Sequence, residues 1–264
     1  MLTAAKRQFK ISMLSTKYAL MRAMVNKATF VMSIVFMILN NATFIIQYLI
    51  LFSLKEDVGG YTFNQVLMLW ALASGTFGVA HFFFKKAFNL SETITNGKLD
   101  AYIVQPKNIL LQAITSDIDS SAIGDLLYGF ILIFVSGITI KKFIFFTIFV
   151  ILGGLIHVAF AVILASFSFW ISRSDIIADT FNSMIIHINT YPEGIFGGIT
   201  RVVLYTLIPV GFISYIPVQV LTSFNIMSFI YVLLFTAFII GLAFFMFYKG
   251  LKKYSSSNLM ISKI

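Results

Sequence analysis

The sequence predicts an all-α protein that crosses a membrane six times. Of its 264 residues, 59% are hydrophobic and only 11% are charged, and the mean hydropathy is +0.94. Soluble domains carry about 25% charged residues, so this composition excludes an ordinary soluble domain. The apolar residues gather in long runs, and we expect spans at about 28–54, 62–84, 121–139, 143–171, 176–191 and 226–248.

The first 27 residues predict a helix that lies on the membrane surface. They carry six basic residues, and Phe9, Met13, Leu20 and Met24 recur at steps of four and seven residues. A basic amphipathic helix of this kind lies in the interface of an anionic cytoplasmic leaflet. A charged cytoplasmic tail without such a helix is the alternative.

The second predicted span contains small residues that allow close helix packing. Ala71 and Gly75 are four residues apart, and so are Ser74 and Gly78. Small residues at this spacing let two helix backbones approach each other within a membrane. We therefore expect neighbouring helices to pack tightly against this span.

Polar side chains within the first and fifth predicted spans indicate a transport pathway. They are Asn40, Asn41, Gln47, Asn182, Ser183 and His187. Amides at membrane depth usually bond to another helix, so helix association is the alternative. If they line a pathway, their aromatic and aliphatic surroundings suit an amphipathic or lipid-like cargo better than a free ion.

One ionisable residue, Asp125, stands near the start of the third predicted span. An ionisable group inside a span is by default a functional hypothesis. Asp125 is only about one turn from the predicted inner edge, so the position favours a structural role. We expect its carboxylate to reach the interface or to pair with a basic neighbour.

The longest polar stretch is the loop 85–119, between the second and third predicted spans. Its backbone cannot lie in hydrocarbon, where unpaired polar groups are costly, so it protrudes into water. We expect one short helix at about 91–96, ended by Gly97, and a second at about 108–114. Pro106 disfavours helix at the residue before it. A solvated linker is the alternative interpretation of this loop.

The segment 192–222 predicts a broken helical hairpin rather than an ordinary span. It contains three of the four prolines, Pro192, Pro209 and Pro217, together with several glycines. Broken backbone at membrane depth is tolerated only when it is buried in protein or lines a cavity. We expect two short helices, at about 196–208 and 213–222, that enter the outer leaflet and return.

The distribution of basic residues predicts the orientation. With six spans and the N-terminus inside, 15 of the 19 Lys and Arg residues are cytoplasmic: six in the N-terminal helix, four in the loop 85–119, Arg173, and four in the tail that ends with Lys263. Cytoplasmic segments carry an excess of Lys and Arg, so we expect both termini in the cytoplasm. The same rule explains the net charge of +9 without nucleic acid binding.

Motifs for catalysis and for metal binding are missing from the sequence. There is no cysteine, no GxxxxGK[ST], no HExxH and no GxSxG, and the three histidines lie on different predicted spans. We therefore expect no catalytic residue, metal or cofactor in this chain. An intramembrane enzyme is one alternative. An ion- or proton-coupled secondary transporter is another, although no internal repeat relates the two halves.

Two motifs give the sequence a family resemblance. Gly97-Lys98-Leu99-Asp100 followed by Gln105-Pro106 resembles the G-x-L-D…P loop signature of the permease subunits of bacterial ABC type-2 exporters. Tyr191-Pro192, Ile195-Phe196, Arg201, 208–212 and 215–217 resemble a second signature of that subfamily. The order of predicted parts is also similar, from an N-terminal interfacial helix to a final span.

The resemblance implies a permease dimer, of identical or related chains, driven by two separate ABC ATPase subunits that bind ATP and Mg²⁺. It also implies a bacterial plasma membrane as the location. From the polar residues within largely aromatic and aliphatic spans, we expect the cargo to be a hydrophobic drug, lipid or peptide that is moved outward by alternating access. By the same resemblance, the loop carries a coupling helix that contacts the ATPase, with Phe88, Glu92, Gly97, Leu99, Asp100 and Pro106. The hairpin forms an outer gate, with Pro192, Phe196, Arg201, Pro209 and Pro217.

Overall fold

The computed structural model describes residues 2–137, 139–171 and 174–255, and within these ranges it contains helices and no strand. Four helices are long and apolar enough to cross a membrane, or five if one bent pair counts as a span. The four are α2 (Lys27–Leu54), α3 (Phe63–Phe88), α8 (Ile140–Ser166) and α12 (Ile226–Leu251). The predicted class, a helical membrane protein, is confirmed.

Two predicted spans correspond to shorter helices. They are α7 (Ala122–Val135), with 14 residues, and α9 (Ser174–Ile188), with 15 residues. At a rise of about 1.5 Å per residue, each is shorter than the hydrocarbon core of about 30 Å. The count of six spans therefore stays a prediction.

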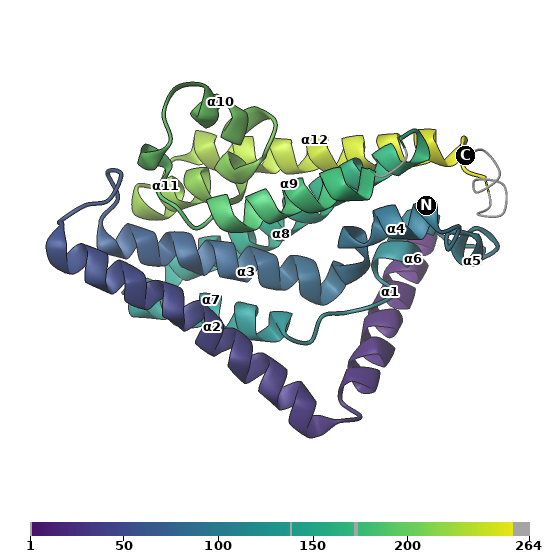
Figure 1. Ribbon diagram of the computed structural model, residues 1–264, viewed down its shortest axis with the longest axis horizontal. Helices are drawn as coiled ribbons and strands as arrows, with labels where there is room; N and C mark the ends of the chain where they lie inside the picture. Colours follow the sequence, from purple (N-terminus) through teal and green to yellow (C-terminus); the bar gives the residue numbers. More distant parts are fainter. Residues whose placement is uncertain (1, 138, 172–173, 256–264) are drawn as a thin grey trace.

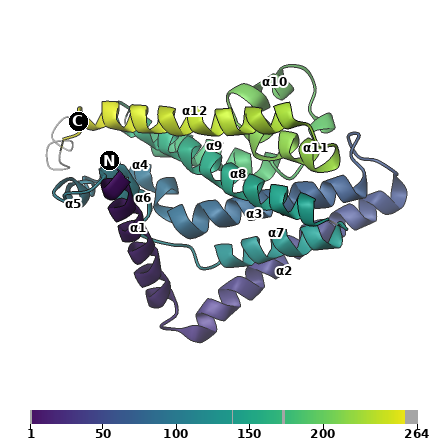
Figure 2. The same ribbon diagram turned by 180° about the vertical axis from the view of Figure 1, so that it is seen from behind.

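Helix α3 lies at the centre of the bundle (Figure 1). It packs against α7 and α8, and α12 packs on the other side of α8. Helix α2 crosses the bundle obliquely and contacts it chiefly through α7. Helix α1 (Leu2–Ala23) meets α2 at an acute angle, so the two form a V that is visible from both sides (Figures 1 and 2).

Glycines allow α7 and α8 to approach α3 closely, as the small-residue pattern predicts. A Cβ atom on Gly78 would lie 2.7 Å from the backbone nitrogen of Leu126, and one on Gly129 would lie 2.7 Å from the carbonyl oxygen of Ala71. On the other side of α3, a Cβ on Gly75 would lie 2.8 Å from the Val150 side chain. These helix pairs therefore touch backbone to backbone or backbone to side chain.

The connecting segments gather at the two ends of the bundle. At one end α4 (Leu90–Thr95), α5 (Asp100–Ile103) and α6 (Ile109–Ile114) lie beside the start of α1 and the end of α12 (Figure 1). At the other end lies the predicted hairpin, beside the loop that joins α2 and α3. Its elements are η2 (Glu193–Ile195), α10 (Gly198–Thr206), the π-helix η3 (Gly211–Tyr215) and α11 (Ile216–Thr222).

The hairpin is broken where the prolines and glycines predict a break. Residues Gly198–Thr206 and Gly211–Thr222 form two helical arms bent by 78°. Gly211 lies after the bend, where the ring of Tyr205 packs so closely on it that a Cβ atom would overlap the ring. A side chain at this corner of the hairpin would therefore require the Tyr205 ring to move.

The structure differs from the expected boundaries in two places. Lys141 and Lys142, which precede the expected span 143–171, lie in the first turn of α8. Helix α3 continues past the expected end at residue 84, with a kink at Phe84, and reaches Phe88 before Asn89 separates it from α4. Arg173 and Lys263, which entered the charge distribution, lie outside the described residues.

We predict that Gly129→Ala destabilises the bundle, because the added methyl group must enter the contact between α7 and α3. Overpacking of this kind costs about 1–3 kcal/mol. The measurement is thermal unfolding of the purified protein in detergent. Gly241→Ala in α12 is the matched control, because a Cβ atom there meets nothing within 4 Å. Equal unfolding temperatures for the two variants would contradict the close contact at Gly129.

Candidate functional site

A cavity of about 470 Å³ lies among α2, α3 and α9. Three of the polar residues predicted on the first span, Asn40, Asn41 and Gln47, line it, and His187 of α9 lies opposite them. Helix α7 contributes Asp125, and α8 contributes a buried histidine, His157. The two predicted spans therefore do supply walls of one cavity.

The other two predicted pathway residues lie elsewhere on α9. Asn182 is buried and does not line this cavity. Ser183 lines a shallow depression formed by α9 alone, which His187 also borders. Asn189, which the sequence did not single out as a pathway residue, lines the large cavity near the end of α9.

Aromatic rings form the apolar part of the cavity wall. The rings of Phe44 and Trp70 are stacked with centroids 5.2 Å apart, and Tyr48 meets Trp70 edge-on at 6.3 Å. The Tyr48 hydroxyl also donates a hydrogen bond to the carbonyl oxygen of Thr190 at 3.2 Å. This bond ties α2 to the segment that follows α9, at one end of the cavity.

Asp125 is held inside the bundle rather than at its edge. Its side chain is buried, and the Asn41 side-chain nitrogen donates to Asp125 Oδ1 at 2.6 Å. The Ser74 hydroxyl donates to the Asp125 backbone oxygen at 2.7 Å. The expected basic partner is therefore replaced by an amide of α2, because α2 packs on α7 and covers the carboxylate.

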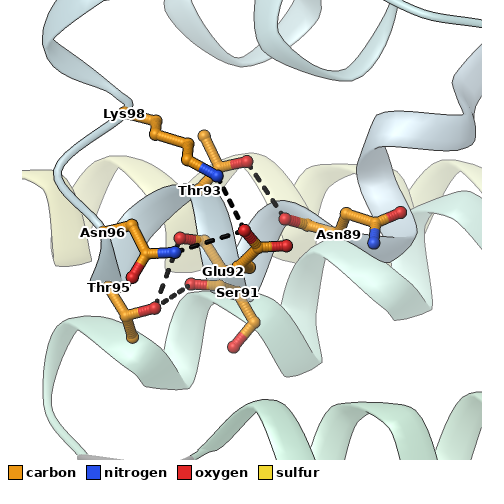
Figure 3. Close-up of polar contacts among 7 residues, drawn as sticks. All are labelled: Asn89, Ser91, Glu92, Thr93, Thr95, Asn96 and Lys98. Carbon is orange, nitrogen blue, oxygen red and sulfur yellow. Dashed lines mark hydrogen bonds and ion pairs between the residues drawn. The ribbon is translucent and has the colours of Figure 1, made fainter.

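Helix α4 ends in a compact polar turn (Figure 3). Lys98 Nζ lies 2.7 Å from Glu92 Oε1, and the Asn96 side-chain nitrogen donates to the same oxygen at 3.2 Å. Lys98 lowers the pKa of Glu92 below its ordinary value. Gly97, between Asn96 and Lys98, has φ +68°, a left-handed conformation that favours glycine. The turn is therefore defined by Gly97 and closed by Glu92.

The predicted coupling residues divide into exposed and internal ones. Glu92, Asp100 and Pro106 are exposed at the end of the bundle. Leu99 is fully buried, and the ring of Phe88 stacks on His81 with centroids 3.9 Å apart. The three exposed residues lie on the surface of the loop, whereas Leu99 and Phe88 anchor the loop to the bundle.

Buried serines connect α4 with α9. The Ser91 hydroxyl of α4 is hydrogen-bonded to that of Ser168, in the short helix η1 (Phe167–Phe169). Ser168 is in turn hydrogen-bonded to Ser174, the first residue of α9, at 2.6 Å. All three side chains are buried. Sequence reasoning missed this chain of contacts because single serines carry no pattern.

Glu193 organises the predicted outer gate, although the sequence signature emphasised its neighbours. Its side chain is 5% exposed and accepts from Arg201 Nε at 2.7 Å and from the Tyr205 hydroxyl at 2.8 Å. Gln219 donates to its other oxygen at 3.3 Å. The Glu193 carboxylate therefore joins η2, α10 and α11.

The remaining predicted gate residues differ in how far their side chains are buried. Pro192, Pro209 and Pro217 are buried, Phe196 is half-buried, and Arg201 is exposed beyond its contact with Glu193. The hairpin also touches the loop between α2 and α3, because a Cβ atom on Gly194 would overlap the carbonyl oxygen of Gly59. One end of the cavity is thus bordered by two segments in direct contact.

Comparison with known proteins identifies the family. Residues 34–258 match a family model described as ABC-2 family transporter protein, which covers most of the chain and includes the cavity, the loop and the hairpin. No curated protein and no solved structure gave a match. The resemblance expected from the loop and hairpin motifs is confirmed. The chain belongs to the ABC-2 family of transporter proteins and is a membrane permease of an ABC transporter.

Proposed function

We propose that this permease exports an amphipathic or hydrophobic cargo by alternating access, powered by two ABC ATPase subunits in separate chains. A second permease, identical or related, completes the pathway. The complex lies in the plasma membrane of a bacterium with both termini of this chain in the cytoplasm. ATP and Mg²⁺ bind to the partner ATPases.

The packing of the loop 85–119 carries this proposal. Leu90, Ile94 and Leu99 are fully buried, so α4 and the turn after it are anchored to the bundle. A solvated linker would instead be polar along its length and would pack on nothing. The anchored loop leaves Glu92, Asp100 and Pro106 exposed at one end of the molecule, where an ATPase can bind them.

The serine contacts provide a route from the ATPase to the cargo cavity. A movement of α4 acts through Ser91 and Ser168 on Ser174, at the start of α9. Helix α9 also carries His187, which lines the cavity. Displacement of α4 would therefore move one wall of the cavity, which is the coupling that alternating access requires.

The end of the molecule that carries this loop has the features of a cytoplasmic face. Helix α1 exposes the basic residues Lys6, Arg7, Lys10 and Lys17 together with the apolar side chain of Phe9. A mixed basic and apolar surface suits the anionic headgroups of the inner leaflet. Arg22 of α1 lies 3.7 Å from Asp117, so α1 is placed directly against the coupling loop.

We predict that the purified chain alone moves no cargo, even when ATP is supplied. Reconstituted in vesicles with its ABC ATPase, it should move fluorescent phospholipids or apolar dyes outward only when ATP is hydrolysed. The control is the same complex with a hydrolysis-deficient ATPase. Sustained uphill movement by the isolated chain would contradict the proposal, because this chain would then contain its own energy coupling.

We predict that Gly97→Val uncouples ATP hydrolysis from transport while the complex still assembles. A side chain at φ +68° costs about 1–2 kcal/mol and opens the turn that Glu92 closes. The measurement is cargo moved per ATP hydrolysed. Gly60→Val is the matched control, because Gly60 has φ +74° at the opposite end of the bundle. An unchanged ratio in Gly97→Val would show that the loop is only a connector.

We predict that Ser168→Ala weakens the transmission of movement from α4 to α9. The chain has no cysteine, so spin labels on Leu54→Cys and Tyr191→Cys report the separation of α2 from the end of α9. The ATP-induced change in that separation should shrink about five-fold or more in the Ser168→Ala complex. Ser136→Ala removes a buried hydroxyl that donates to the Ile133 carbonyl oxygen, one turn back in the chain, and should have no effect. An equal response in both variants would exclude the serine route.

A further inference from the structure

The Asp125 carboxylate is only partly satisfied by the protein. Asn41 donates to Oδ1, but Oδ2 is buried and has no hydrogen-bond partner among the described residues. Asp125 takes part in none of the ion pairs found among the described residues. It lines the cavity, where no lysine or arginine accompanies it. His157 lines the same cavity without forming an ion pair with it.

A buried carboxylate in such surroundings favours a positive partner. Removing a carboxylate from water is costly unless it is paired with a cation or receives several hydrogen bonds. The single hydrogen bond from Asn41 gives the carboxylate only a fraction of the stabilisation that hydration by water would give it. A ligand that brings a positive charge beside Oδ2 would therefore gain from a carboxylate that is already desolvated and held in place.

The wall around Asp125 suits the body of an organic cation. Phe44, Tyr48 and Trp70 form a cluster of rings on α2 and α3. Phe77, about two turns after Trp70 on α3, also lines the cavity. Aromatic faces attract cations, and the attraction is strongest when both are desolvated. Asn189 adds a buried side-chain oxygen that has no hydrogen-bond partner within the described part of the chain.

A small metal ion fits this cavity less well. Mg²⁺ and Ca²⁺ require six or more oxygen ligands, usually with several carboxylates. Among the described residues no group of three or more His, Cys, Asp or Glu side chains could hold a metal ion. A volume of about 470 Å³ with a largely aromatic and aliphatic wall is in the usual range for small organic ligands.

We propose that the cavity among α2, α3 and α9 binds an amphipathic organic cation. The Asp125 carboxylate lies against its charge, and the rings of Phe44, Tyr48 and Trp70 lie against its apolar body. This proposal rests on the proposed function in one respect, since it takes the cavity to be the cargo site. It restricts the proposed class of cargo from amphipathic or hydrophobic molecules in general to amphipathic molecules that carry a positive charge.

The test compares two ions of similar shape and opposite charge. The full-length chain with Trp170→Phe retains a single tryptophan, Trp70, which lines the cavity. Tetraphenylphosphonium should change the Trp70 fluorescence of the purified protein in a saturable manner, whereas tetraphenylborate should not. Equal saturable binding of the two ions, or saturable binding of tetraphenylborate alone, would overturn the proposal.

A second arm assigns the charge preference to Asp125. Asp125→Asn keeps the size of the side chain and should lower the affinity for tetraphenylphosphonium about tenfold or more. Asp119→Asn removes a carboxylate that lies 3.8 Å from Lys85, outside the cavity, and should leave binding unchanged. Unchanged binding by a folded Asp125→Asn variant would overturn the assignment.

This experiment separates the inference from the proposed function. Binding by the isolated chain needs no ATPase, so a preference for the cation supports the inference even if the reconstituted complex exports nothing. Export without a preference for positive charge would instead leave the exporter function standing and remove this inference alone.

Discussion

The close contact of α7 and α8 with α3 is the constraint on which the other features depend. Gly78 and Gly129 remove the side chains that would separate α3 from α7, and Gly75 does the same toward α8. Since hydrocarbon provides no hydrophobic driving force between helices, dispersion contacts at such crossings hold a membrane bundle together. The same contact brings Asp125 beside Ser74 and so places one carboxylate at the wall of the cavity.

The short helix η1 connects α4, α9 and α12 at one end of the bundle. Phe169 packs so closely on Gly250 of α12 that a Cβ atom there would overlap its ring, while Ser168 joins α4 to α9. Burial and the nearby Asp100 carboxylate raise the pKa of the Tyr254 hydroxyl, beyond the end of α12, to about 12. The loop 85–119 is therefore joined through η1 to α9 and α12 at the same end of the bundle.

Much of this architecture could be predicted from local sequence. The turn at Gly97, the helices on either side of it and the break around Pro209 follow from residues that restrict their own backbone. The small-residue spacing of Ser74 and Gly78 likewise predicted a crossing. Contacts between distant residues could not be predicted, because neither Ser91 with Ser168 nor Asn41 with Asp125 leaves a pattern in one sequence. For the same reason Asp125 was expected at the interface, although α2 in fact covers it.

The bond between Asn41 and Asp125 would connect the proposed binding of a cation with the position of α2. Helix α2 contacts the bundle mainly through α7, and this bond is a buried polar link between them. A carboxylate that gains a cation no longer depends on a single amide for its stabilisation. Occupation of the cavity would therefore reduce the energetic cost of separating Asn41 from Asp125. Helix α2, which supplies Asn40, Asn41 and Gln47 to the cavity wall, is thus hydrogen-bonded to the carboxylate that we propose binds the cation.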